Sequence, residues 1–229
     1  MVNMSENWLI LETSGRVARI GLTREGKVVR AAELDTSRRH AREMVPTIDA
    51  LLTAESLRPT NLTGVTVSRG PGSYTGLRVG LATAKALVYS TDCALRAVDT
   101  FAAIAEQAPA EAERLWVIAD ALQGQVYAEC FVREPGGWCS REALRIMTVG
   151  AFAALLPVGD WISGPGVSVH DAHIAQANPR VIEADREVRV ESVFTIGLRL
   201  APLTKDELFA LEPLYLRGSS AEEKAKQPK

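Results

Sequence analysis

The chain has 229 residues, of which 47% are hydrophobic and 24% charged, and its formal net charge is −2. This length and composition are typical of a globular protein with a buried core, and the slightly acidic balance excludes the broad basic surface with which a protein grips nucleic acid unaided. No apolar run approaches the ~20 residues of a membrane-spanning helix. The three cysteines are scattered without a Cys-x-x-Cys pair, and the first residues lack a signal-peptide pattern. These features predict a cytoplasmic protein with reduced thiols and no membrane attachment.

The first half of the chain is predicted to contain strands followed by alternating helices and strands. Strands are expected at Trp8–Glu12, Val17–Leu22, Val28–Leu34, 64–68 and 94–98, and helices at about 37–55, 74–89 and 100–108. Asp35-Thr36-Ser37 caps the first helix, and its apolar stripe is Met44, Ile48, Leu51 and Leu52. Pro46 lies inside this helix and is expected to kink it. The predicted order is therefore βββαβαβα.

A glycine-rich turn joins the strand at 64–68 to the helix that follows it. Residues 68–80 read Ser-Arg-Gly-Pro-Gly-Ser-Tyr-Thr-Gly-Leu-Arg-Val-Gly. A turn of this kind directs backbone N–H groups and the positive end of a helix dipole toward one point, which suits an anion. Gly70, Gly72 and Ser73 are the candidate anion-binding residues. The spacing matches neither a P-loop nor a dinucleotide fingerprint, so a structural turn and a phosphate cradle both stay open.

The second half of the chain repeats the order of the first. Its strand at 117–120 ends in Asp120 as the first strand ends in Glu12, and a second Gly-Pro-Gly turn at 164–166 follows in the same order. This repetition favours duplication, with an N-terminal lobe at 1–108, a C-terminal lobe at 113–217 and a disordered tail at 218–229. Two duplicated βββαβα-type lobes describe an α/β fold of the actin-like ATPase and sugar-kinase (ribonuclease H-like) architecture.

Four segments carry a resemblance to a known family. They are Leu-Ile-Leu-Glu-Thr-Ser at 9–14, the segment 68–80, Ile-Ala-Asp-Ala-Leu-Gln-Gly-Gln-Val-Tyr at 118–127 and Leu-Glu-Pro-Leu-Tyr-Leu-Arg at 211–217. In this order they resemble the bacterial TsaB (YeaZ) family, formerly called glycoprotease-like, over nearly the whole chain. The resemblance implies a part in threonylcarbamoylation of the tRNA adenosine beside the anticodon. It further implies a non-catalytic subunit, a homodimer when alone, that pairs with the paralogue TsaD, is joined by the ATPase TsaE, and meets tRNA only through that complex.

The chain departs from the catalytic paralogue and, at one position, from TsaB itself. Matching the His-x-x-x-His metal motif of TsaD through Val98 places Thr100 and Ile104 at the two histidine positions, and neither offers an imidazole. The first strand of the family usually ends in Asp, whereas here it ends in Glu12, whose carboxylate reaches roughly 1 Å farther, a shift that would be ruinous for a reacting group. We therefore expect no catalytic residue, no metal and no cofactor.

The resemblance also implies that the helices of the first half form a dimer face. Gly76, Gly80 and Ala84 recur every four residues along the second helix, and Gly80 costs about 1 kcal/mol against Ala in a helix interior. Close approach of another helix backbone would offset that cost, whether from the helix at 37–55, from its copy in a partner, or from both. The candidate partner interface consists of Met44, Ile48, Leu51, Gly76, Gly80 and Ala84.

Several other residues admit two interpretations. His170, Asp171 and His173 could ligate zinc, but a solvated loop or helix start is favoured because no further ligand pair lies at suitable spacing. A basic patch at Arg38, Arg39, His40 and Arg42 is read as a solvated face or as a contact for an acidic partner or tRNA. Arg78 and Lys85 share one helix face, near the possible anion site, although salt bridges would explain them equally well.

The alternative function is that of a small-molecule phosphotransferase of the actin-like and sugar-kinase superfamily. It would use Glu12, Asp120 and the two Gly-Pro-Gly turns. A peptidase, which the old family name suggests, is disfavoured because the chain has no zinc-peptidase motif and no recognisable nucleophile–histidine spacing.

Overall fold

A computed structural model describes residues 6–34, 40–183 and 186–216. The first half of the chain forms one sheet with its helices, in the order β1 (Trp8–Glu12), β2 (Ala18–Arg24), β3 (Lys27–Leu34), α1 (His40–Ala54), β4 (Gly64–Gly70), α2 (Tyr74–Thr91), β5 (Ala94–Asp99) and α3 (Thr100–Ala105). A short 3₁₀ turn, Pro59–Asn61, precedes β4. This confirms the predicted order of strands and helices.

The second half forms a second sheet. Its elements are β6 (Arg114–Asp120), β7 (Gln125–Glu134), β8 (Gly137–Thr148), α4 (Val149–Leu155), β9 (Trp161–Ser163), α5 (Gly166–Val169), α6 (Asp171–Ile174), a 3₁₀ turn (Ala175–Ala177) and β10 (Arg180–Val181). Two further helices, α7 (Val190–Arg199) and α8 (Lys205–Ala210), follow.

The two sheets have the same topology. The first runs β3-β2-β1-β4-β5 and the second, read from its far edge, runs β8-β7-β6-β9-β10. In each, the first two strands of the half pair antiparallel, and the first strand pairs parallel with the strand that precedes the Gly-Pro-Gly turn. The predicted duplicated α/β architecture of the actin-like ATPase type is confirmed.

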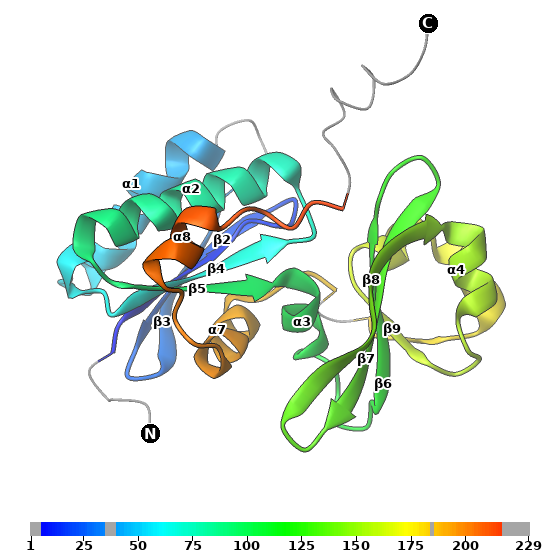
Figure 1. The fold of residues 1–229 in the computed structure, drawn as a ribbon. Coiled ribbons are helices and arrows are strands. Elements are labelled where there is room, and N and C mark those ends of the chain that lie inside the picture. Colours follow the sequence, from blue (N-terminus) through cyan, green and yellow to red (C-terminus); the bar gives the residue numbers. More distant parts are fainter. Residues whose placement is uncertain (1–5, 35–39, 184–185, 217–229) are drawn as a thin grey trace, which may run out of the picture.

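The central strand β1 separates two layers of helices. Leu9 and Leu11 face a core shared with α1 and α2, whereas Trp8 and Ile10 face a core shared with α7, as the two-residue period of a strand requires. All five β1 residues are buried, so helices must cover both faces of this sheet (Figure 1). Each fully buried aliphatic side chain stabilises the fold by roughly 1.5–3 kcal/mol.

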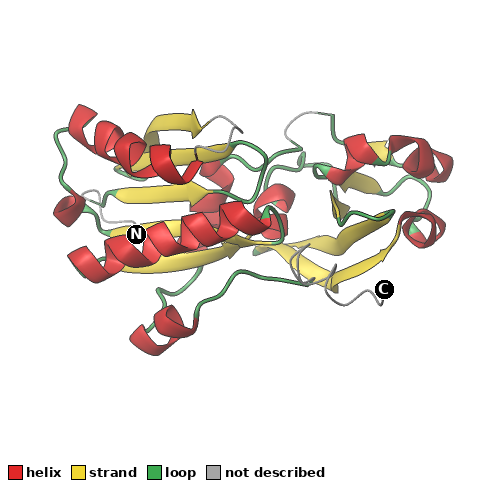
Figure 2. Cartoon of the chain, turned by 90° about the horizontal axis from the view of Figure 1, so that it is seen from above, coloured by secondary structure: helices red, strands yellow, loops and turns green. Residues whose placement is uncertain are grey.

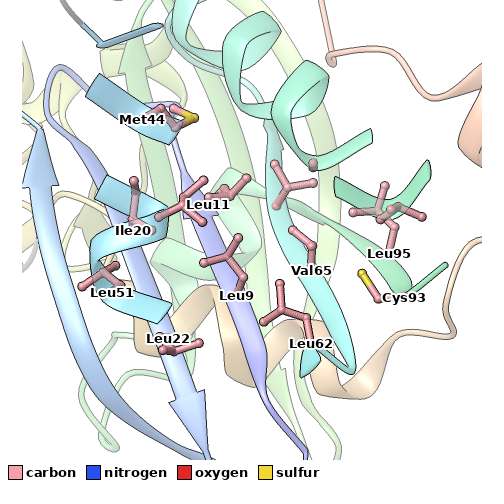
Figure 3. Close-up of a cluster of buried hydrophobic side chains, with 14 of the residues drawn as sticks. Leu9, Leu11, Ile20, Leu22, Met44, Leu51, Leu62, Val65, Cys93 and Leu95 are labelled. Carbon is pink, nitrogen blue, oxygen red and sulfur yellow. The ribbon is translucent and has the colours of Figure 1, made fainter. Parts of the chain in front are cut away.

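The helix α1 contributes its apolar stripe to the first core. Met44, Ile48, Leu51 and Leu52 are all buried and belong to the same core cluster as Leu11, Ile20 and Leu22. Figure 3 shows Met44 and Leu51 beside these strand residues. The helix continues through Pro46. Its predicted cap at 35–37, the patch residues Arg38 and Arg39, and the side chain of His40 lie outside the described residues, as does the tail at 218–229.

The chain returns to the first sheet after its second sheet is complete. The helix α7 packs against β1, β4 and β5, and the N–H of Leu203 donates to the carbonyl of Leu95 at 2.8 Å. Farther on, Leu208 is buried in the first core and the N–H of Leu214 donates to the carbonyl of Arg69 at 2.7 Å. Residues 190–216, predicted as part of the C-terminal lobe, therefore lie against the N-terminal sheet.

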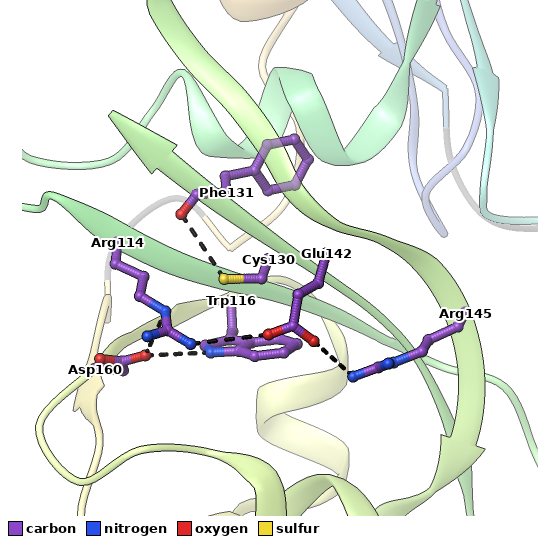
Figure 4. Close-up of polar contacts among 7 residues, drawn as sticks. All are labelled: Arg114, Trp116, Cys130, Phe131, Glu142, Arg145 and Asp160. Atoms are coloured by element: carbon purple, nitrogen blue, oxygen red, sulfur yellow. Dashed lines mark hydrogen bonds and ion pairs between the residues drawn. The ribbon is translucent and has the colours of Figure 1, made fainter. Parts of the chain in front are cut away.

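A polar cluster ties the β9 end of the second sheet to its centre. Asp160 pairs with Arg114 Nε at 3.1 Å and accepts a hydrogen bond from the Trp116 indole at 3.2 Å (Figure 4). Glu142 on β8 approaches the same guanidinium at 3.9 Å. The cluster adds charged contacts between β6, β8 and the loop before β9 to the apolar packing of Trp116 and Ile162.

Candidate functional site

The glycine-rich segment forms the strand, turn and helix that its sequence predicts. β4 ends at Gly70, and α2 begins at Tyr74 with Ser73 as its cap, whose hydroxyl accepts a hydrogen bond from the Gly76 N–H at 3.2 Å. Gly70 has a φ of +117°, a backbone conformation that favours glycine. The turn at residues 70–73 therefore connects the end of β4 directly to the start of α2.

This turn packs directly on the end of β1. The N–H of Ser73 donates to the carbonyl of Ser14 at 2.7 Å, and a Cβ on Gly72 would lie closer than 3.0 Å to that same carbonyl oxygen. Glycine at position 72 is thus required by the close approach of the chain's own backbone. Since the Ser73 N–H is already used by Ser14, the geometry supports a structural turn more strongly than a phosphate cradle.

Glu12, at the end of β1, is fully enclosed. Its Oε1 accepts hydrogen bonds from the Ser14 N–H at 2.7 Å and from the Ser14 hydroxyl at 2.5 Å, while its Oε2 has no hydrogen-bond partner among the residues that the structure describes. Burial raises the pKa of this carboxyl, and the bonds from Ser14 only partly oppose that effect. Glu12 therefore holds the β1–β2 connection through its hydrogen bonds with Ser14, and none of its surface is exposed to a ligand.

The corresponding acid of the second half lies in a different environment. Asp120 Oδ1 lies 3.1 Å from His170 Nε2 and accepts a hydrogen bond from the Leu122 N–H at 3.0 Å, and its side chain remains 30% exposed. The turn at Gly164 and Gly166 packs on the backbone of β6 as the first turn packs on the β1 end. The pairing of Asp120 with His170 was not predicted, because their 50-residue separation follows no known motif.

The phosphotransferase interpretation needs both carboxylates to reach a metal-bound nucleotide. Glu12 has no exposed surface, whereas Asp120 is partly accessible. The two acids therefore cannot act as a matched pair in this conformation. A shallow depression of about 250 Å³ lies elsewhere, beside β3 and the start of α7, and none of the predicted site residues lines it.

The residues considered as metal ligands do not form a metal site. Thr100 and Ile104 both lie buried on α3, and their hydroxyl and alkyl groups are not the imidazoles that the matched motif would supply. His170 is engaged by Asp120, and His173 is exposed. Within residues 6–34, 40–183 and 186–216, no three His, Cys, Asp or Glu side chains come together in a way that could hold a metal ion.

The cysteines give no support to a peptidase. Burial raises the pKa of the Cys93 and Cys130 thiols, which disfavours the nucleophilic thiolate. The Cys139 pKa is also raised, chiefly by its hydrogen bond to Glu134.

Among the helices that the structure describes, none has the length and apolarity needed to cross a membrane.

The residues predicted as a partner interface lie inside the monomer. Met44, Ile48 and Leu51 are respectively 1%, 4% and 9% exposed, because they pack in the core of the first sheet rather than facing solvent. Ala84 is also fully buried. The apolar stripe of α1 is thus core in the monomer, whereas Val45, at the edge of that stripe, is 61% exposed.

The small residues of α2 accommodate the β1–β2 connection instead of another helix. A Cβ on Gly76 would lie closer than 3.0 Å to the Thr13 carbonyl oxygen, and one on Gly80 would lie equally close to the Thr13 hydroxyl. Both clashes lie within the chain. The interpretation of Gly80 as the contact point of a partner helix is therefore replaced by close packing against Thr13.

The structure brings together two of the recognised segments in a cluster that the sequence did not predict. The Tyr74 and Tyr215 rings stack with centroids 4.7 Å apart, and the Arg78 guanidinium lies 4.1 Å from the Tyr74 ring centroid. Arg78 Nε also donates to the Tyr215 hydroxyl at 2.9 Å. Farther along α2, Lys85 donates to the carbonyl oxygen of Phe209 at 3.2 Å. The cations predicted to share one helix face thus both contact the returning C-terminal segment.

Comparisons with known proteins find relatives named for one tRNA modification. Residues 34–133 match the family model described as TsaD, tRNA N6-adenosine threonylcarbamoyltransferase. The chain is 31% identical over 128 residues to the tRNA threonylcarbamoyladenosine biosynthesis protein TsaB of Bacillus subtilis, and 28% identical over 142 residues to that of Escherichia coli. These alignments span only 56% and 61% of the respective relatives.

Two longer matches extend over almost the whole chain. An uncharacterized protein of Mycobacterium tuberculosis is 30% identical over 217 residues, which cover 93% of this chain and 92% of that protein. The solved structure of YeaZ from Pseudomonas aeruginosa superposes with a TM-score of 0.77 at 22% identity, covering 92% of this chain and 100% of that one. At that identity the superposition shows the shared fold.

Proposed function

Because this chain belongs to the TsaB (YeaZ) family, we propose that it is a non-catalytic subunit in the biosynthesis of threonylcarbamoyladenosine in tRNA. In this proposal it pairs in the cytoplasm with a TsaD-type paralogue, which carries the reaction, and works with a TsaE-type ATPase. It encounters tRNA through that complex. Its own contribution is to complete or stabilise the paralogue.

One observation carries the proposal. The positions that would bear the metal-binding histidines of the paralogue hold Thr100 and Ile104, both buried on α3, and Ile104 belongs to the core cluster that joins the two sheets. The burial of Glu12 supports it further, because the first-strand carboxylate has no access to a substrate. A chain with an intact two-lobe fold and neither group available is suited to a supporting role.

The test is reconstitution of the modification with purified proteins from the same host. Threonylcarbamoyladenosine should form in tRNA only when this chain is present with its TsaD-type and TsaE-type partners, and the chain should co-purify with the TsaD-type protein. Equal product without this chain would contradict the proposal. So would product formed by this chain alone.

A further inference from the structure

The strand β3 forms an edge of the first sheet that no other described segment covers. Helices lie over both faces of this sheet (Figure 2), so an additional strand can join it only at an edge. At the opposite edge, the N–H of Leu203 donates to the carbonyl of Leu95 on β5 at 2.8 Å. Among the described residues, 27–33 make backbone hydrogen bonds to β2 alone, which leaves the outward N–H and C=O groups of β3 for another chain.

The edges of the second sheet are protected in ways that the edge at β3 is not. The pairing of β8 with β7 shifts its register at two successive points, and the other edge strand, β10, has only two residues. Bulges and very short strands both hinder the addition of a further strand. The pairing of β3 with β2 shifts once, near its start, and is regular from Arg30 to Leu34. This regular run is therefore the edge best suited to an added strand.

The charged side chains of this run are neutralised within the same lobe. Arg30 Nε pairs with Glu55 Oε1 at 2.6 Å beside the end of α1, and Glu33 Oε1 pairs with Arg19 Nε at 2.9 Å on the face that carries α7. Charged side chains often protect edge strands by repelling an approaching backbone or by demanding water. Because both charges already have partners on the sheet faces, they protect this edge weakly.

The depression of about 250 Å³ lies directly beside this edge, on the face of the sheet that carries α7. Its apolar lining comes from Ala31, Ala32 and Val190. Gly21 and Ala31 lie opposite each other on β2 and β3 and have little or no side chain, which leaves the space beside Val190 open. The remaining lining residues carry two charges of each sign: Arg19, Glu33, Arg189 and Glu191. The depression therefore suits an uncharged aliphatic side chain.

A second copy of the chain fits this edge poorly. Two β3 strands related by a two-fold axis normal to the sheet pair antiparallel, and residues opposite each other must point to the same face. The registers centred on Arg30 and on Glu33 place each of these charges opposite its own copy, which is destabilising. The register centred on Ala31 offers the depression only a methyl group, and the one centred on Ala32 offers it the Glu33 carboxylate.

We propose that β3, from Arg30 to Leu34, is a docking site for an extended segment of a different protein. The segment pairs with β3 as an added strand and places one aliphatic side chain, of the size of valine, isoleucine or leucine, in the depression beside Val190. Main-chain hydrogen bonds supply affinity in this mode of recognition, and the side chain in the pocket supplies selectivity. The inference goes beyond the proposed function and does not depend on it.

The test titrates the full chain with short synthetic peptides of alternating threonine and lysine that carry leucine, alanine or aspartate at the centre. In NMR titrations the leucine peptide should shift the amide signals of residues 30–34 and bind about tenfold more tightly than the alanine peptide. The aspartate peptide should bind most weakly. Methylation of the backbone nitrogens of the leucine peptide that pair with β3 should abolish its binding, because the added strand then loses its donors.

A matched pair of variants locates the site. Ala31→Leu fills the depression and should remove the preference for the leucine peptide over the alanine peptide. Ala143→Leu makes the same change at an exposed alanine of β8 and should preserve the preference. Circular dichroism verifies the fold of each variant. The peptide comparison on the wild-type chain decides the proposal even if Ala31→Leu does not fold.

Three results would overturn the proposal. The first is equal affinity for the leucine and alanine peptides, or binding of neither. The second is a preference for leucine that persists in a folded Ala31→Leu protein. The third is self-association in sedimentation equilibrium that Ala31→Leu abolishes and Ala143→Leu preserves, which would assign this edge to a second copy of the chain.

Discussion

The ring of Tyr215 stacks on the ring of Tyr74, with centroids 4.7 Å apart and planes inclined by 26°. Tyr74 opens the helix after the first Gly-Pro-Gly turn, and Tyr215 lies at the end of the described chain. The contact closes the first lobe with residues that follow the second lobe in sequence. The two segments most specific for the family are therefore neighbours in space.

This contact predicts that the end of the chain stabilises the first lobe. Tyr215→Ala removes the stacked ring and the bond from Arg78, so the free energy of unfolding should fall by roughly 1–3 kcal/mol in urea denaturation. Tyr215→Phe keeps the ring and should lose only about 0.5–1.5 kcal/mol. The matched control is Tyr89→Ala, an exposed tyrosine of the same helix, for which a change within about 0.5 kcal/mol is expected. Equal losses at 215 and 89 would mean that the stack contributes nothing.

Gly80 predicts a clash that a second substitution can relieve. Gly80→Ala should destabilise the monomer, and Gly80→Leu should prevent folding, because the three nearest atoms to an added Cβ all belong to the Thr13 side chain. Thr13→Ala should restore part of the stability of Gly80→Ala. It should not rescue Gly76→Ala, whose Cβ would meet the Thr13 carbonyl oxygen.

The control for these glycine substitutions is Gly150→Ala in α4. An added Cβ there meets no atom within 4 Å, so the change should be neutral or stabilising by up to about 1 kcal/mol. A well-folded Gly80→Leu protein that has lost only its partner would restore the interface interpretation of this position.

Glu12 predicts a stability that declines as pH rises. Its pKa is raised above the ordinary value of 4.5 by burial, so the folded state holds the proton more tightly than the unfolded state. The resulting stabilisation is complete below the unfolded pKa and is lost as pH rises from there through the folded pKa. Glu12→Gln should remove this pH-dependent loss of stability. The measurement is the free energy of unfolding in urea, compared between variant and wild type from acidic to neutral pH.

A companion variant checks the cause of that shift. The Ser14 hydroxyl bonds to Glu12 and lowers the carboxyl pKa, so Ser14→Ala should extend the decline in stability to higher pH. Parallel stability profiles for wild type, Glu12→Gln and Ser14→Ala would show that Glu12 does not titrate differently on folding. The comparison isolates Glu12 from Glu129, whose pKa burial also raises.

The purified chain alone is expected not to turn over ATP or to transfer its phosphate. The physical reason is that Glu12 is enclosed and the turn at Gly72 is filled by the backbone of Ser14. Phosphate release measured with and without Mg²⁺ provides the assay. Turnover above background that disappears in Asp120→Ala would revive the phosphotransferase interpretation.

Local patterns in the sequence were sufficient for the order of elements and for the duplication. The strands β1 and β4 and the repeat of an acidic residue followed by a Gly-Pro-Gly turn depend on periodicity and turn chemistry within a few residues. The family resemblance rested on short segments for the same reason. These features required no knowledge of which distant residues meet.

The roles of individual side chains depended on contacts that local patterns do not encode. The stripe of Met44, Ile48 and Leu51 reads equally well as core or as interface, and only the position of α1 over the sheet assigns it to the core. A glycine at position 80 predicts close packing against another part of the molecule but does not indicate which residue lies there. The structure shows that this residue is Thr13. The pairs Asp120–His170 and Tyr74–Tyr215 arise where the chain returns on itself, and the physical reason they escape sequence reasoning is that tertiary packing alone selects partners so far apart.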